Sequence, residues 1–116
     1  MRDYRQLQVW LDARQLALEV YAATSKFPRE ERFGLSSQMQ RASVSITSNI
    51  AEGCGRGSKK ELARFLEIAR GSAFELESQI DIAVGLGLFS GTHSSVDRCN
   101  KLKRSLSQLI NRVRED

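Results

Sequence analysis

The sequence has few of the residues from which metal and redox sites are built. It contains two cysteines and one histidine, and Cys54 and Cys99 do not form a CxxC pair. Zinc sites need several closely spaced Cys or His ligands, so we expect no metal and no other cofactor. Cys99 falls at an apolar helical position and is interpreted as a small core residue. Cys54 lies among glycines, where an exposed thiol is possible.

Long apolar runs are also missing. The longest apolar run, residues 82–89 with two glycines included, is far shorter than the roughly 20 residues that span a bilayer. The first residues, MRDYRQLQVW, contain no apolar stretch of the kind found in a secretory signal. We therefore expect a cytoplasmic protein without a membrane anchor.

The chain contains one proline among 116 residues, with 41% hydrophobic and 28% charged residues. This composition is typical of a folded, soluble protein. The length suits one domain, residues 1–116, and leaves no room for a second.

Apolar residues recur at helical spacing in four segments, and no segment alternates convincingly as a strand. The expected helices run from about 8 to 24, from about 34 to 52, from SKKE at 58–61 to GLGLFSG at 85–91, and from THSSVD at 92–97 through Val113. Short loops between amphipathic helices favour antiparallel neighbours. The sequence therefore predicts an all-α protein, an up-down-up-down antiparallel four-helix bundle.

The segment NIAEGCGRGSKKE, residues 49–61, is rich in glycine and basic residues. A phosphate-binding loop of either common pattern would need a glycine at position 58, which is Ser58. We interpret the segment as a connector in which Gly53 closes a helix in the left-handed conformation and Gly55 and Gly57 permit the reversal. Ser58 and Glu61 then form a capping box, with each side chain bonding to the other residue's amide.

Three blocks carry a family resemblance: QVW at 8–10, FPREERFGLSSQMQRASVSITSNIAEGCGR at 27–56, and FLEIARGSAFELESQI at 65–80. They resemble the four helix bundle protein family, over nearly the whole chain. That family includes proteins encoded within intervening sequences of bacterial large-subunit ribosomal RNA genes, and it is related to the accessory variability proteins of diversity-generating retroelements. The resemblance implies a homopentamer without an established enzyme activity. The retroelement relatives bind nucleic acid and a reverse transcriptase.

The first expected helix has a core stripe of Val9, Ala13, Leu16 and Val20. At 100° per residue, a second apolar stripe lies about 180° away and consists of Leu7, Leu11, Leu18 and Ala22. This predicts burial against another subunit, so we expect a homo-oligomer. Phe74, on the outer side of the third helix, is a further candidate interface residue. The alternative is a set of scattered surface leucines, which are common on soluble proteins.

A polar seam follows the second and third helices at heptad-like spacing. Its members are Gln38, Arg41, Ser45, Asn49 and Glu52, then Ser72, Glu75 and Gln79. We interpret the seam as a structural network that specifies helix pairing, with Asn49 fixing the register. Acid–base catalysis is the alternative, but no nucleophile, metal or histidine accompanies the carboxylates, so we expect no enzyme.

The fourth helix carries four basic residues on its outward side: Arg98, Lys101, Arg104 and Arg112. They are candidates for binding nucleic acid, and Arg56, Lys59 and Lys60 at the connector between the second and third helices are secondary candidates. The net charge of +4 and the pI near 9.4 suit an acidic polymer. No aromatic residue accompanies the basic ones, so we expect backbone-directed binding of RNA or DNA with little sequence specificity. The alternatives are an ordinary solvated face, or a structural, protein-binding ring without a nucleic-acid role.

Overall fold

The computed structural model of the protein describes residues 3–115. Its four long helices are α1 (Gln8–Thr24), α2 (Leu35–Cys54), α3 (Lys59–Gly85) and α4 (Ser94–Glu115). Two short 3-10 helices, η1 (Tyr4–Gln6) and η2 (Arg29–Glu31), precede α1 and α2. Residues 3–115 contain no strand, which confirms the predicted all-α class.

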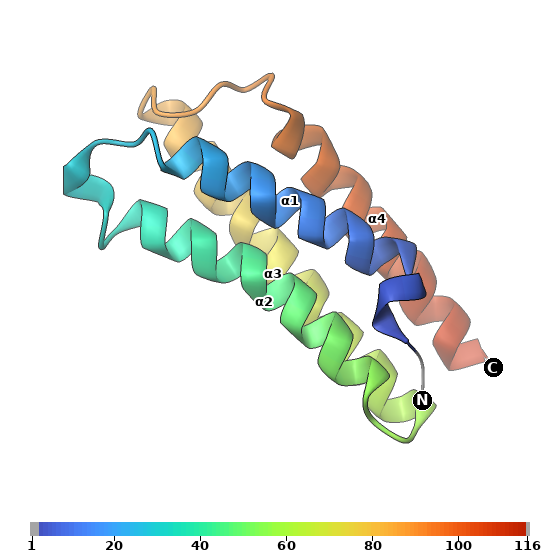
Figure 1. The fold of residues 1–116 in the computed structure, drawn as a ribbon. Helices are drawn as coiled ribbons and strands as arrows, with labels where there is room; N and C mark the ends of the chain where they lie inside the picture. The colour runs from blue at the N-terminus through green and yellow to red at the C-terminus, as the bar shows by residue number, and fades with distance from the viewer. Residues whose placement is uncertain (1–2, 116) are drawn as a thin grey trace.

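The helices form an elongated bundle of 45 × 22 × 19 Å. Helix α2 packs against α1 and α3, and α4 packs against the same two helices from the other side (Figure 1). Helices α1 and α3 therefore lie diagonally across the bundle. The α2–α3 loop and both ends of the described chain lie at one end of the bundle, and the other two loops lie at the opposite end.

The core consists of the apolar faces that the helical spacing predicts. Val9, Ala13, Leu16 and Val20 of α1 are buried, and equivalent stripes from α2, α3 and α4 meet them. Burying a large aliphatic side chain stabilises a fold by roughly 1.5–3 kcal/mol, so these stripes hold the bundle together. Helix α1 also begins and ends at the predicted residues, 8 and 24.

The end of α2 differs from the prediction. Gly53 does not close the helix in a left-handed conformation, because α2 continues through it to Cys54. A Cβ atom at Gly53 would lie 2.9 Å from the Cβ of Phe65, so this glycine allows close packing of α2 on α3. Within residues 3–115 the only positive φ belongs to Gly87, at 75°.

Gly87 ends α3 in a Schellman motif. The amide of Leu88 donates to the Ala83 carbonyl at 2.9 Å, and the amide of Gly87 donates to the Val84 carbonyl at 3.0 Å. The GLGLFSG segment therefore stops α3, as the sequence predicts.

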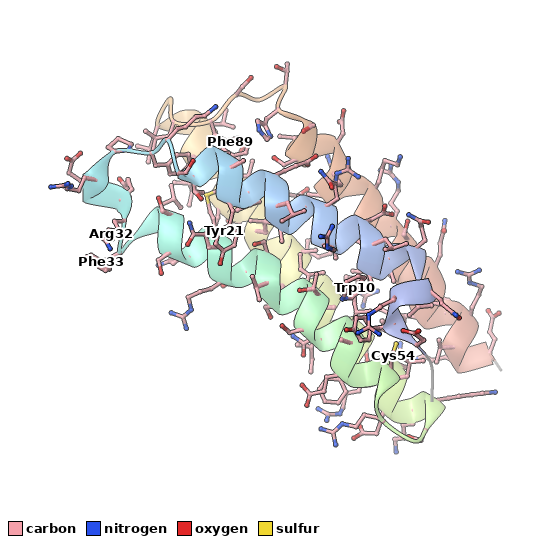
Figure 2. The ribbon with its side chains drawn as sticks, viewed as in Figure 1. Trp10, Tyr21, Arg32, Phe33, Cys54 and Phe89 are labelled. Carbon is pink, nitrogen blue, oxygen red and sulfur yellow. The ribbon has the colours of Figure 1, made fainter. Side chains whose placement is uncertain are left out.

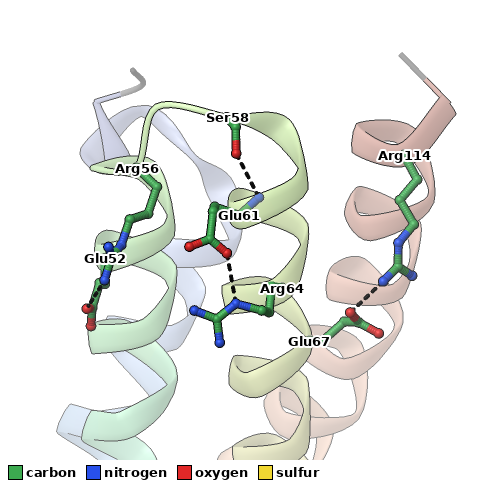
Figure 3. Close-up of polar contacts among 7 residues, drawn as sticks. All are labelled: Glu52, Arg56, Ser58, Glu61, Arg64, Glu67 and Arg114. Atoms are coloured by element: carbon green, nitrogen blue, oxygen red, sulfur yellow. Dashed lines mark hydrogen bonds and ion pairs between the residues drawn. The ribbon is translucent and has the colours of Figure 1, made fainter.

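The start of α3 confirms half of the predicted capping box. Ser58 Oγ accepts a hydrogen bond from the Glu61 amide at 3.1 Å. The Glu61 carboxylate does not return to Ser58, because it accepts a hydrogen bond of 2.8 Å from Arg64 Nε (Figure 3). This partner lowers the pKa of Glu61.

Both cysteines are buried. Cys99 is a core residue, as predicted, and its thiol donates to the Ala73 carbonyl at 3.4 Å. Burial raises the pKa of this thiol to about 11, so it stays protonated at neutral pH. Cys54 does not expose its thiol: although it lies next to the glycine-rich loop, it is buried as the last residue of α2 (Figure 2). No helix within residues 3–115 is long and apolar enough to cross a membrane.

Candidate functional site

The outward side of α4 presents a strip of basic side chains. Lys101, Arg104 and Arg112 are exposed, with Gln108 between the last two. Steps of three or four residues keep successive side chains on one side of a helix. No ion pair to a carboxylate of residues 3–115 involves any of these three basic residues. We call Lys101, Arg104 and Arg112 the basic strip.

Other basic residues of α4 turn toward α3 and are neutralised there. Lys103 pairs with Glu77, and Arg114 pairs with Glu67 (Figure 3). These pairs, together with a hydrogen bond of 3.2 Å from Arg70 to Ser107 Oγ, line the contact between the two helices. Among the basic residues of α4, those that remain available to a ligand therefore lie on its outward side.

Arg98 lies apart from the basic strip. Its Nε atom donates to the Glu19 carboxylate at 3.2 Å, and the two side chains are 34% and 15% exposed. The pair joins α4 to α1. The sequence groups Arg98 with the nucleic-acid candidates by helical spacing, but the structure shows that it is partly buried and already engaged with a carboxylate.

The secondary basic candidates lie at the end of the bundle that holds the α2–α3 loop. Arg56 pairs with Glu52 at 3.1 Å (Figure 3). Lys59 and Lys60 are exposed in the first turn of α3. They line a groove of about 490 Å³ together with Arg114 of α4, so the fold brings these lysines beside the end of the helix that carries the basic strip.

The second apolar stripe of α1 is exposed for the most part. Leu11 and Leu18 are 43% and 50% exposed, and Ala22 is also exposed. Leu7 differs, because it is half-buried and packs against the core of its own bundle. The candidate subunit contact on α1 is therefore carried mainly by Leu11 and Leu18.

Phe74 is 53% exposed but does not join the α1 stripe. It lies on α3, diagonally across the bundle from α1, with the Lys103 ammonium 4.6 Å from the centre of its ring. It also lines a groove of about 570 Å³ between α3 and α4. The predicted interface residues therefore occupy two separate surfaces.

The polar seam lies where α2 meets α3. Ser45 and Ser72 share a hydrogen bond of 2.9 Å between their hydroxyls, which links the two helices directly. Asn49 donates to the Ser45 carbonyl at 2.8 Å and to Ser45 Oγ at 3.1 Å. Asn49 therefore reaches α3 through Ser45, a dependence that heptad spacing alone does not reveal.

The centre of the seam opens into a notch of about 410 Å³. Its walls are Gln38, Arg41, Ala42 and Ser45 from α2, with Glu75 and Gln79 from α3. Arg41, Glu52 and Glu75 are exposed, so the seam holds no buried charge. Gln79 is buried, and its Oε1 atom has no hydrogen-bond partner among residues 3–115. The sequence places Gln79 in the seam but cannot show that its acceptor is unsatisfied.

No cluster of three or more His, Cys, Asp or Glu residues suitable for a metal ion occurs within residues 3–115. The fold and its surfaces thus define a small four-helix-bundle protein with an outward basic strip and an exposed apolar stripe. The model of the family described as 23S rRNA-intervening sequence protein matches residues 5–112. Because this match covers nearly the whole chain, the protein belongs to that family. The search of curated proteins gave no significant match.

Proposed function

We propose that the protein is a non-catalytic homo-oligomer that binds RNA or DNA without sequence specificity, as an accessory protein of an RNA- or DNA-linked element. The observation that supports this proposal is the basic strip: Lys101, Arg104 and Arg112 project from one side of α4 without a carboxylate partner among residues 3–115. The family to which the chain belongs is described by its link to 23S rRNA, which is compatible with an RNA-linked role.

The strip suits a phosphate backbone better than base edges. Lys101 and Arg112 are eleven residues apart, or about 16 Å along a helix, which spans several phosphates of an extended strand. Helix α4 contains no aromatic residue on which a base would stack. Contacts of this kind position a nucleic acid and carry little sequence information.

Assembly would multiply the strip. In this proposal the four helices run up-down-up-down, and the subunits associate through apolar surfaces that include Leu11 and Leu18, as a pentamer according to the family resemblance. Several copies of the strip on one particle would raise the local positive potential and the apparent affinity for a long polyanion. A nucleic-acid enzyme such as a reverse transcriptase is the protein partner that the resemblance suggests.

A second candidate function is a structural, protein-binding ring without a nucleic-acid role. The exposed Leu11 and Leu18 favour it, because an apolar stripe serves protein contacts whether or not the α4 strip has a ligand. In that case the strip would meet an acidic protein surface, or only solvent.

Fluorescence anisotropy with labelled single-stranded RNA and duplex DNA separates the two functions. At about 50 mM salt, where phosphate contacts are strongest, the nucleic-acid proposal predicts binding that is similar for unrelated sequences. Absence of binding under these conditions would refute it and leave the protein-binding ring.

A further inference from the structure

A residue that lines the notch between α2 and α3 has a buried acceptor without a donor among residues 3–115. Gln79 is 7% exposed, and its Oε1 atom has no hydrogen-bond donor within residues 3–115, while its side chain helps to line the notch. An unsatisfied buried acceptor is unusual in folded proteins and costly to maintain. Glu75, on the same wall, has no ion pair within residues 3–115. Together these two side chains suit a group that offers several N–H donors and a positive charge.

Exposed apolar residues flank the notch along α3. Ile68 and Ile82 are 41% and 54% exposed, and each lies seven residues from Glu75. A spacing of seven residues places all three on one side of the helix, as in the contact seam of a coiled coil. An apolar–acidic–apolar line of this kind suits another helix better than a small solute.

The complementary pattern occurs on α1 of the same sequence. Leu11 and Leu18 are also seven residues apart and exposed, and Arg14 lies between them. Arg14 is exposed and has no ion pair within residues 3–115. The exposed side of α1 thus carries an apolar–cationic–apolar line, which is complementary to the apolar–acidic–apolar line of α3.

We propose that the notch receives Arg14 from a second copy of the chain, so that α1 of one subunit packs on the α2–α3 face of the next. The guanidinium of Arg14 donates to the exposed Glu75 carboxylate and, once the Gln79 side chain turns toward the notch, to Gln79 Oε1; it has enough donors to satisfy both. Leu11 and Leu18 pack into the spaces between Glu75 and the flanking Ile68 and Ile82. The inference rests on the proposed homo-oligomer and assigns the two faces that meet in it.

The spacing along the two helices supports this fit. Leu11 and Leu18 are about 10 Å apart along α1, and Ile68 and Ile82 are about 21 Å apart along α3, at 1.5 Å per residue. Each leucine can therefore sit between Glu75 and one isoleucine. Arg41, on the opposite wall of the notch, repels the incoming cation and directs it to the α3 wall.

The position of the two faces fixes the type of assembly. Helices α1 and α3 are diagonal in the bundle, so the α1 stripe and the α3 line lie on different sides of one subunit. Each subunit then uses one face to donate Arg14 and another face to accept it. Such a heterologous contact repeats from subunit to subunit and closes into a ring when the rotation allows.

Cross-linking tests this contact directly. The full chain carrying both Arg14→Cys and Glu75→Cys should give, on mild oxidation, a ladder of disulfide-linked subunits in denaturing, non-reducing gels. Only a chain that carries both cysteines can be linked to one neighbour through residue 14 and to another through residue 75. Each single variant should therefore give linked dimers at most. The matched control, Arg104→Cys with Glu75→Cys, places the second thiol at an exposed position of α4 and should give no ladder.

Charge reversal provides the second measurement. Arg14→Glu or Glu75→Arg alone should raise the apparent dissociation constant of the assembly about thirtyfold or more, as expected for an unpaired charge in a contact. The double reversal should restore the wild-type mass, whereas Arg104→Glu should leave it unchanged. Circular dichroism of each variant excludes unfolding as the cause.

The outcomes separate this inference from the proposed function. A wild type that is monomeric at micromolar concentration overturns the homo-oligomer and the contact together. If the wild type is a stable oligomer but the Arg14→Cys, Glu75→Cys variant gives no ladder, or the double reversal does not rescue the single reversals, the contact alone is overturned. A ladder together with rescue establishes it.

Discussion

Helices α1 and α4 are neighbours in the bundle, and their outward sides differ in chemistry. The outward side of α1 carries half-exposed leucines around Arg14, whereas that of α4 carries Lys101, Arg104 and Arg112. Both helices bury an ordinary apolar stripe in the same core. The buried sides therefore explain the fold, and the difference between the outward sides is the basis of the two proposed partners: a protein surface for α1 and a polyanion for α4.

The ion pair between Arg98 and Glu19 marks the boundary between these surfaces. It holds α4 against α1 and removes one cation from the region that would otherwise join the basic strip. Neither Leu11 nor Arg104 contributes to the buried core. Substitutions on either outward surface should therefore leave the core and the other surface intact.

Charging the α1 surface should have the largest effect. In the double variant Leu11→Glu and Leu18→Glu, both carboxylates would have to lose water in an apolar subunit contact, which is strongly unfavourable. We expect the oligomer to dissociate into smaller, folded species, measured by light scattering with size-exclusion chromatography.

The matched control adds two carboxylates to the α4 surface through Lys101→Glu and Gln108→Glu. This variant should keep the mass of the wild type while losing affinity for nucleic acid. If the control dissociates as readily as the α1 variant, the comparison between the two surfaces is wrong.

A change in the core should weaken the fold without favouring either surface. In Gly53→Ala the added Cβ would lie 2.9 Å from Phe65 Cβ, so α2 and α3 would have to separate. We expect the free energy of unfolding to fall by about 1–3 kcal/mol, measured by urea denaturation. Gly71→Ala, where nothing lies within 4 Å of the added Cβ, should instead raise stability by about 0.5–1 kcal/mol. Equal effects of the two substitutions would contradict the close approach at Gly53.

Gly53 also illustrates what a sequence can and cannot predict. Helical spacing gave both ends of α1 and the buried face of each helix, because an apolar stripe reflects the core directly. It could not distinguish a glycine that ends a helix from one that admits a neighbouring helix, because the neighbour Phe65 comes from another segment. The same limit applies to Arg98 and Gln79: helical spacing gives the side of the helix, whereas Glu19 and the unsatisfied Oε1 atom depend on packing between helices.

Neutralising the basic strip should reduce nucleic-acid affinity and leave assembly unchanged. Each phosphate contact on duplex DNA adds about −0.9 to the slope of log affinity against log salt. The triple variant with Lys101, Arg104 and Arg112 changed to glutamine should therefore bind more weakly and with a flatter slope. Anisotropy titrations at several salt concentrations measure both quantities. A slope that stays at the wild-type value would place the phosphate contacts elsewhere, with the Lys59 and Lys60 groove as the next surface to test.

Replacing Arg98 should have the smallest effect on binding and so sharpen the boundary between the two surfaces. Arg98→Gln removes the partner of Glu19, whose side chain is 15% exposed, and we expect it to lower the free energy of unfolding by about 1 kcal/mol. Because the Arg98 guanidinium already faces a carboxylate, its loss should change the salt slope less than Arg104→Gln does, although each substitution removes one positive charge. Urea denaturation and anisotropy on the two single variants make this comparison at equal net charge. If Arg98→Gln flattens the slope as much as Arg104→Gln does, Arg98 leaves Glu19 to contact phosphate, and the basic strip extends to the edge of α1.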